Sequence, residues 1–316
     1  MFIVDCHCDT LSELYKQNKS LYANDLMLDA ERIIKNGGGL QFMAMFIPTD
    51  IFRAGAGATY TLKLIDTYLR GLRELEQKGL NVNRVLSKED LKKLPNGQFN
   101  TLLAIEEGGA LDGSLEVLRV YYELGVRCMT LVWSNRNDIA DGVNEECSKS
   151  GLTMFGRRVV AEMNRLGIAV DVSHLNIQGF YDILGKTDMP PLASHSCCRA
   201  LRDHPRNLWD DQLKALFAAG GYVGVNFLPY FLITPDKPCT IDTVIDHIDH
   251  LHQLGGQGKV GFGSDFDGIG EKPEGLDNPS DFPALLEGLR RRGYQEQTIQ
   301  DIAGRNLLAY YRRIAG

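Results

Sequence analysis

The sequence lacks the features of a membrane protein and those of a nucleic-acid-binding protein. No run of apolar residues approaches the ~18 that a membrane-spanning helix needs. The 34 Lys and Arg residues are outnumbered by 41 Asp and Glu residues, and the formal net charge of -7 argues against a protein that binds a phosphate backbone. We therefore expect neither nucleic acid nor membrane as a partner.

Cysteine usage and the amino terminus predict a cytoplasmic protein. The seven cysteines are scattered, their number is odd, and none form a C-x-x-C pair, which favours a reducing compartment over a disulfide framework. Met1 leads directly into the first expected strand, which leaves no room for a signal peptide.

The chain also has no linker rich in Pro, Gly or Ser, no internal repeat and no low-complexity tract. At 316 residues it can bury a large core, and α/β barrels of this length commonly form one domain. We predict a single domain over residues 1–316.

Short apolar, β-branched runs alternate with segments of helical periodicity. Eight strands that alternate with helices favour a parallel sheet, and eight is the number that closes a (β/α)8 TIM barrel. A doubly wound open sheet is the alternative, but no G-x-G-x-x-G follows the first strand, which disfavours its nucleotide-binding version. The predicted strands are 2–6, 40–47, 101–105, 126–132, 168–172, 191–194, 222–227 and 259–263. The predicted helices are 11–16, 29–35, 58–79, 113–125, 153–166, 175–185, 209–219, 240–254, 281–291 and about 296–314.

Three other segments have simple local interpretations. The charged stretch 80–100 is typical of a solvated helix, and Ala54–Ala58 of a mobile loop or a lid. His247, His250 and His252 lie on a predicted outer helix, where surface ion pairs with neighbouring carboxylates account for them.

The first strand carries a candidate metal site. His7 and Asp9 are two residues apart, so their side chains point to the same face of an extended chain. An imidazole and a carboxylate make half of a coordination shell for a divalent cation. Cys6 and Cys8 point to the other face, where we expect them to pack in the core.

Other ionisable residues follow later strands. Glu106, His174, His195 and Asp265 each come directly after an apolar run. Barrel active sites lie where all the strands end, so these side chains are expected at one rim. Together with those of the first strand, they supply three imidazoles and three carboxylates. That set is sufficient for two metals sharing a carboxylate.

An arginine is expected at the same rim. Arg206 lies in the loop after the sixth predicted strand, within Asp203-His204-Pro205-Arg206-Asn207. A guanidinium is planar, permanently charged and bidentate, which suits a substrate carboxylate. A hydrogen bond that stabilises the loop is the alternative role.

Over nearly its whole length the chain resembles the zinc-dependent membrane (renal) dipeptidases and their bacterial relatives. The resemblance is specific because it comes from many motifs in one order. These motifs are Asp5-Cys-His7-Cys-Asp9, Ala104-Ile-Glu106-Glu-Gly-Gly109, Gly151-Leu-Thr-Met-Phe-Gly156, Glu162-Met-Asn-Arg-Leu-Gly167, Asp171-Val-Ser-His174, Ser194-His195-Ser196, Arg206-Asn207 and Gly263-Ser-Asp-Phe-Asp-Gly268.

The resemblance implies two zinc ions per chain. One zinc would be held by His7, Asp9 and Glu106, and the second by Glu106, His174 and His195. Glu106 would therefore bridge the two ions.

The resemblance also implies roles for residues around the metals. Asp265 matches the carboxylate that handles protons, and Glu106, preferred over the adjacent Glu107, joins it as a catalytic residue. Arg206 matches the arginine for the substrate's terminal carboxylate, and Asn207, next to it in the motif, is expected to bind substrate as well. The family hydrolyses dipeptides and tolerates a D-residue at the C-terminal position, and a homodimer is also implied.

One position departs from the family pattern. Animal members place a histidine after a Thr-Leu-Thr strand, whereas this chain reads Thr130-Leu-Val-Trp133. That histidine polarises the scissile carbonyl, and an indole can donate one hydrogen bond but cannot become cationic. We expect Trp133 to contact substrate and to change the substrate range, with Asn135, Arg136 and Asn137 as alternative donors.

The sequence as a whole predicts a binuclear-zinc dipeptidase that cleaves L-L and L-D dipeptides with a metal-bound hydroxide. Asp265 would pass a proton to the leaving amine, and Arg206 would bind the substrate carboxylate. An amidohydrolase acting on N-acyl amino acids or a cyclic amide is the alternative that Trp133 keeps open. A non-catalytic metal-binding barrel is disfavoured, because it would have no need of Asp265.

Overall fold

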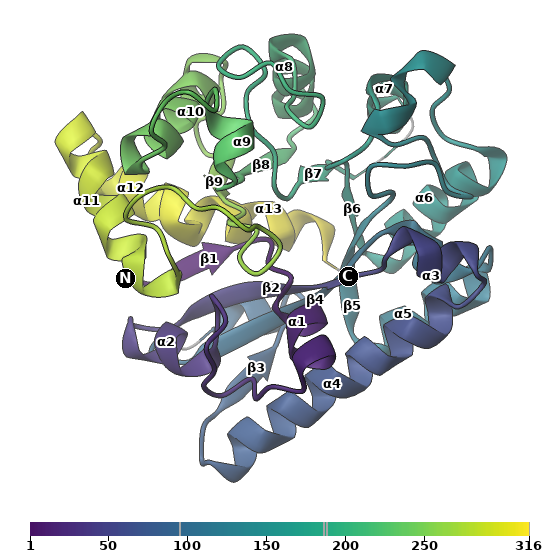
Figure 1. Ribbon diagram of the computed structural model, residues 1–316, viewed down its shortest axis with the longest axis horizontal. Coiled ribbons are helices and arrows are strands. Elements are labelled where there is room, and N and C mark those ends of the chain that lie inside the picture. The colour runs from purple at the N-terminus through teal and green to yellow at the C-terminus, as the bar shows by residue number, and fades with distance from the viewer. Residues whose placement is uncertain (95, 186, 188, 316) are drawn as a thin grey trace.

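The computed structural model describes residues 1–94, 96–185, 187 and 189–315, and its centre is a closed barrel of parallel strands (Figure 1). The strands follow one another in the order β2-β1-β9-β8-β7-β6-β5-β4, and pairing of β2 with β4 closes the barrel. All of these pairings are parallel. The predicted (β/α)8 barrel is confirmed. Its strands are β1 (Ile3–Asp5), β2 (Gly39–Phe46), β4 (Phe99–Glu106), β5 (Val126–Thr130), β6 (Ala169–Asp171), β7 (Leu192–Ala193), β8 (Tyr222–Val225) and β9 (Val260–Phe262).

The register of β4 brings a key glutamate to the rim. Gly39 of β2 lies opposite Phe99, and the pairing continues without a shift to Phe46 opposite Glu106. On the other edge of β4, Glu106 lies opposite Thr130 of β5. Glu106 thus ends its strand at the carboxyl face of the barrel, where enzymes with this fold carry their active sites.

Helices surround the barrel (Figure 1), and the helices predicted from periodicity are confirmed with small changes of their bounds. Two short helices, α3 (Thr49–Arg53) and α9 (Pro229–Leu232), were not predicted. Within the described ranges, no helix is both long and apolar enough to cross a membrane. The predicted helices appear as α1 (Thr10–Gln17), α2 (Ala30–Lys35), α4 (Gly57–Gln77), α5 (Leu115–Leu124), α6 (Met154–Leu166), α7 (Ile177–Leu184), α8 (Asp210–Ala218), α10 (Ile241–Gln253) and α11 (Phe282–Arg292).

The last predicted helix is divided into three parts. It consists of α12 (Glu296–Gln300), a π-helical segment (Asp301–Arg305) and α13 (Asn306–Ile314). A Cβ at Gly304, within the π segment, would lie 2.6 Å from Cγ2 of Val4. The wider turn therefore lets the backbone approach β1 closely, which a glycine permits.

The stretch 80–100 differs from the predicted solvated helix. Val82–Arg84 forms β3, which pairs with the first residues of β4, and among the described residues of this stretch only Asp90–Lys92 forms a helical turn. A strand of three residues is too short to show a period of two in a charged segment.

The predicted loop Ala54–Ala58 is also shorter in the structure. Helix α4 begins at Gly57, and the backbone N–H groups of Gly57 and Ala58 donate to the carboxylate of Asp112 at 3.2 and 2.9 Å. The second half of this stretch is therefore fixed to the barrel.

Helix α13 closes the amino-terminal end of the barrel. Its Tyr311 hydroxyl donates to the carbonyl of Arg127, near the start of β5, at 2.6 Å. The Tyr310 hydroxyl donates to the carbonyl of Pro190, just before β7, at 2.8 Å. The carboxyl ends of the strands remain available for a site. The buried cluster at the closed end contains Val4, Leu40, Phe42, Leu102, Leu192, Tyr222, Leu307, Tyr310, Tyr311 and Ile314.

The surface interpretation of His247 is wrong. Its side chain is fully buried, where Nδ1 accepts the backbone N–H of Cys198 at 3.0 Å and Nε2 donates to the carbonyl of Leu232 at 2.9 Å. His250 does form a surface pair, but with Asp210 of α8 at 2.8 Å. His247 lies on the face of α10 that packs on the barrel. A polar residue at this position suggested a surface location in the sequence.

Candidate metal centre and substrate pocket

The chain after β1 places His7 and Asp9 at the carboxyl rim. The backbone N–H of Asp9 donates to the carbonyl of Phe266 at 2.9 Å, which fixes the segment against the turn after β9. Cys6 and Cys8 are buried in the surrounding packing, as predicted. Helix α1 begins immediately after Asp9, so the metal candidates lie at its amino-terminal end.

Glu106 lies between the imidazole of His7 and those of His174 and His195. Its Oε2 is 3.4 Å from Nε2 of His7. Its Oε1 is 3.0 Å from Nε2 of His174 and 3.4 Å from Nε2 of His195. One carboxylate oxygen thus faces each side, as a bridging ligand requires. Glu107 points elsewhere, where it accepts backbone N–H groups of Gly109 and Trp133.

The charges of this cluster are strongly coupled. Burial alone would raise the pKa of Glu106, but His7 and the adjacent His174 and His195 outweigh it and hold that pKa well below its usual range. Burial opposes the protonation of His7, yet the nearby Glu106 and Asp9 carboxylates raise the pKa of His7 well above its usual range.

The donor atoms fit divalent metal ions. Potential ligand atoms of His7, Asp9 and Glu106 lie within 4.8 Å of one another, and so do those of Glu106, His174 and His195. Nε2 of His7 and Oδ1 of Asp9 are buried and have no hydrogen-bond partner. Buried polar atoms are rarely left unpaired, and these two point into a group of nitrogen and oxygen ligands that suits zinc.

Asp265 lies beside the metal candidates. Its Oδ1 is 3.7 Å from Nε2 of His7, and its Oδ2 accepts the amide N–H of Asn226 at 2.8 Å. Burial, opposed by His7 and reinforced by the Glu106 charge, raises the pKa of Asp265 to about 6. A Cβ at residue 268 would lie 2.1 Å from Asp9 Oδ2 and 2.6 Å from Asp265 Oδ1, so only glycine fits there.

Arg206 points into the same pocket and is 5% exposed. Its Nη2 donates to the carbonyl of His195 at 3.1 Å, and its guanidinium carbon lies 5.4 Å from the centre of the Phe231 ring. Nε has no partner. The guanidinium therefore keeps donors available for an anionic ligand.

Asn207 does not reach the pocket, in contrast to the expected substrate contact. Its amide donates to the carbonyls of Arg202 and Phe231, both at 2.8 Å. These bonds tie the Arg206 loop to α9. Adjacency to Arg206 in the motif could not reveal this direction.

Trp133 forms part of the pocket wall, at ring-centre distances of 5.2 Å from Phe46 and 6.0 Å from His174. Two of the three alternative donors after it are used within the protein. Arg136 pairs with Asp141, and Asn137 donates to Glu107 and to the carbonyl of Leu131. Asn135 is different, because its side-chain oxygen accepts from Asn144 and its amide N–H groups are not engaged by that bond.

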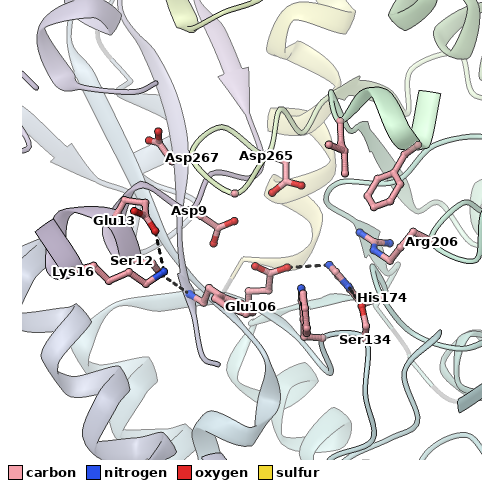
Figure 2. Close-up of a pocket in the computed structure, with 15 residues that line it drawn as sticks. Asp9, Ser12, Glu13, Lys16, Glu106, Ser134, His174, Arg206, Asp265 and Asp267 are labelled. Carbon is pink, nitrogen blue, oxygen red and sulfur yellow. Dashed lines mark hydrogen bonds and ion pairs between the residues drawn. The ribbon is translucent and has the colours of Figure 1, made fainter. Parts of the chain in front are cut away.

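The pocket has a volume of about 290 Å³, and different charged residues lie at its two sides (Figure 2). Arg206 lies on one side, together with the Phe231 ring that its guanidinium contacts. Glu13 and Lys16, an ion pair at 2.9 Å on α1, line the other. The sequence analysis missed several lining residues, although the helical spacing of positions 9, 12, 13 and 16 could have indicated those on α1. The missed residues are Ser12, Glu13, Lys16, Phe46, Ser134, Leu228, Phe231, Asp267 and Gly268.

Known proteins resemble this chain in sequence and in fold. An uncharacterized dipeptidase of Schizosaccharomyces pombe is 39% identical over 216 residues, which are 68% of this chain and 53% of that protein. This chain spans about half the length of the curated relatives it matches. Among solved structures, a metallopeptidase of family M19, dipeptidase AC, has a TM-score of 0.89 at 27% identity and covers 100% of this chain and 99% of its own.

A second solved structure contains a ligand. It is a metallopeptidase from Rhodobacter sphaeroides liganded with a phosphinate mimic of the dipeptide L-Ala-D-Ala, with a TM-score of 0.87, 27% identity and 99% of each chain covered. The family model of the membrane dipeptidases, peptidase family M19, matches residues 1–315. This match confirms the predicted resemblance, and the chain belongs to the membrane dipeptidase family.

Proposed function

We propose that this protein is a metal-dependent dipeptidase that holds two zinc ions at the carboxyl rim of its barrel. The observation that carries the proposal is the position of Glu106, whose Oε2 faces His7 and whose Oε1 faces His174 and His195. His7 and Asp9 would complete one site with Glu106, and His174 and His195 the other. The unpartnered Nε2 of His7 and Oδ1 of Asp9 support this assignment, because a cation would satisfy both atoms.

When bound, the ions supply Lewis-acid activation of a water molecule and of the amide carbonyl. The protein must supply a proton acceptor, and Asp265 fits that role. Its raised pKa of about 6 lies near neutral pH, where a carboxyl can both accept and return a proton. The amide of Asn226 holds one carboxylate oxygen, which orients the other toward His7.

Arg206 would select the substrate by its free carboxylate. A buried guanidinium with unused donors pairs strongly with such a group. The volume of the whole pocket, about 290 Å³, favours short peptides. The side chain of the C-terminal residue would then lie against Leu228 and Phe231, which form the apolar wall beside Arg206.

We extend the proposal to both L-L and L-D dipeptides, because a related metallopeptidase is liganded with a mimic of L-Ala-D-Ala. A second candidate is the hydrolysis of N-acyl amino acids or of cyclic amides. Trp133 favours it, since its indole ring lies 6.0 Å from the His174 ring and cannot become cationic as the family's histidine can.

A hydrolysis screen combined with metal analysis tests the proposal. The panel contains L-L dipeptides, L-D dipeptides, N-acyl amino acids and dipeptide amides. We expect zinc-dependent cleavage of free dipeptides and little cleavage of the amides. Faster turnover of N-acyl amino acids than of any dipeptide would favour the second candidate. Activity that persists after chelation and dialysis would overturn both.

A further inference from the structure

His195 has a second ring nitrogen, which faces a buried hydroxyl behind the metal candidates. Nδ1 of His195 lies 2.7 Å from Oγ of Ser194, and this oxygen lies 2.5 Å from Oδ2 of Asp171. We propose that Asp171 and Ser194 are positioning residues that fix the tautomer of His195, so that its Nε2 lone pair faces the metal. This inference rests on the proposed binuclear centre.

The surroundings of Asp171 determine where the Ser194 proton lies. Oδ1 of Asp171 accepts the backbone N–H groups of Ser173 and Ser194, both at 3.0 Å. Oδ2 accepts the hydroxyls of Thr130 at 2.6 Å and of Ser194 at 2.5 Å. A carboxylate has about four acceptor positions, and four donors fill them here. Asp171 is thus an acceptor only, and the proton of Ser194 points to it.

The tautomer of His195 follows from this count. A serine hydroxyl has a single proton, so only lone pairs of Ser194 remain for His195. Nδ1 of His195 must then carry a hydrogen and donate it. A neutral imidazole has one N–H, which leaves a lone pair on Nε2. That nitrogen lies 3.4 Å from Oε1 of Glu106. The reverse arrangement would place a hydroxyl lone pair against a carboxylate lone pair at 2.5 Å.

The barrel contains a second pair of an aspartate and a serine, Asp5 and Ser264, whose hydroxyl does not contact an imidazole. Oδ1 of Asp5, the last residue of β1, accepts the backbone N–H groups of Ser264 at 2.9 Å and His7 at 3.4 Å. Its Oδ2 accepts the Ser264 hydroxyl at 2.6 Å. The Ser264 oxygen then contacts the backbone carbonyl of His7 at 3.3 Å, not an imidazole ring. Asp5 therefore offers the same local chemistry without control over a tautomer.

The substitution Asp171→Asn should invert the tautomer without changing the shape of the side chain. The amide oxygen must accept the two backbone N–H groups, so the NH₂ group faces the hydroxyls of Thr130 and Ser194. Ser194 then accepts from Asn and donates to Nδ1 of His195. The ring hydrogen moves to Nε2, where it blocks the metal. Loss of such an outer hydrogen bond typically weakens metal binding about 10- to 100-fold.

Two measurements on the full-length chain test the inference. NMR of the metal-free protein labelled with ¹⁵N-histidine reports which ring nitrogens carry hydrogen, and competition with a chromophoric chelator gives the zinc affinity. We expect Asp171→Asn to change the ring signals of one histidine and to weaken one zinc site about 10- to 100-fold. Asp5→Asn should leave the tautomers and the zinc affinity as in the parent.

The inference is overturned if Asp171→Asn keeps the parent tautomers and affinity, or if Asp5→Asn weakens zinc binding equally. If Asp171→Asn fails to fold, Ser194→Ala is the replacement test, because it removes only the hydroxyl that accepts from Nδ1 of His195. It should populate both tautomers and weaken zinc, and parent-like behaviour of this variant would again overturn the inference. A parent chain that binds no zinc would contradict the proposed function, while the NMR signals would still decide the tautomer.

Discussion

The Nε2 atoms of His174 and His195 lie 2.8 Å apart, beside Oε1 of Glu106. Burial and the charge of Arg206 lower the pKa of His174 to about 4, and burial together with His7 holds the pKa of His195 well below its usual range. Both rings are therefore neutral at pH 7, and each has one nitrogen lone pair. A divalent cation is the partner that two imidazoles and a carboxylate can bind together.

Arg206 is expected to recognise the free carboxylate of a dipeptide. A charge-assisted hydrogen bond contributes roughly 1.5–3 kcal/mol. Arg206→Met should therefore reduce kcat/KM on a free dipeptide about ten- to a hundred-fold. The corresponding dipeptide amide should be a poor substrate of the parent and should lose little more in the variant.

The two substrates and two proteins together form a double cycle that isolates the pairing. Equal losses on both substrates would mean that Arg206 only stabilises its loop through the carbonyl of His195. Asn207→Ala is a useful comparison, because its amide ties the same loop and does not reach the pocket. Its effect should be the same on the acid and on the amide.

Asp265 is expected to transfer the proton. Such a group typically contributes ~10²–10⁴-fold to the rate, so Asp265→Asn should lower kcat by about that factor and keep the metal content of the parent. The acceptor must be deprotonated, so activity falls as the pH falls through its pKa. Burial raises that pKa to about 6, and bound cations would oppose this rise and move the acidic limb to lower pH. The pH profile of Asp265→Asn should lack this fall in activity at acidic pH. A variant that loses metal instead would identify Asp265 as a ligand.

Buried His247 should make folding stability depend on pH. Burial lowers its pKa from 6.5 to about 4, so between these values the unfolded chain binds the extra proton. This part of the stability is complete above about pH 6.5 and is lost as the pH falls toward 4, which amounts to about 2 kcal/mol between pH 7 and 5. Urea unfolding should show that His247→Gln is less stable than the parent at pH 7 but loses less stability at pH 5. Equal losses in both proteins would contradict this account.

The barrel and the ligand cluster could be predicted because both depend on where strands end. Glu106 and His174 follow apolar, β-branched runs, and parallel strands in a barrel bring their carboxyl ends together. The family resemblance then assigned the pairing of ligands within the cluster. Oε1 and Oε2 of Glu106 face different imidazoles, and the assignment of ligands to each ion stays a prediction.

Other features depend on tertiary packing that no local pattern describes. His247 looks like a surface residue in Asp246-His247, and only its contacts with Cys198 and Leu232 explain its burial. Glu13 and Lys16 have the spacing of one helix face, but nothing in the sequence places that face opposite Arg206. Asn207 is adjacent to Arg206, yet its side chain leaves in another direction.

The metal content of the purified full-length chain, measured by mass spectrometry beside dipeptidase activity, tests the central claim most directly. We predict about two zinc ions per chain, because Glu106 offers one oxygen to each group of ligands. Glu106→Gln should lose both ions, whereas Glu13→Gln, a matched change in the same pocket, should keep both. One ion or fewer in a fully active parent, or an active Glu106→Gln variant that keeps its metal, would contradict the binuclear centre.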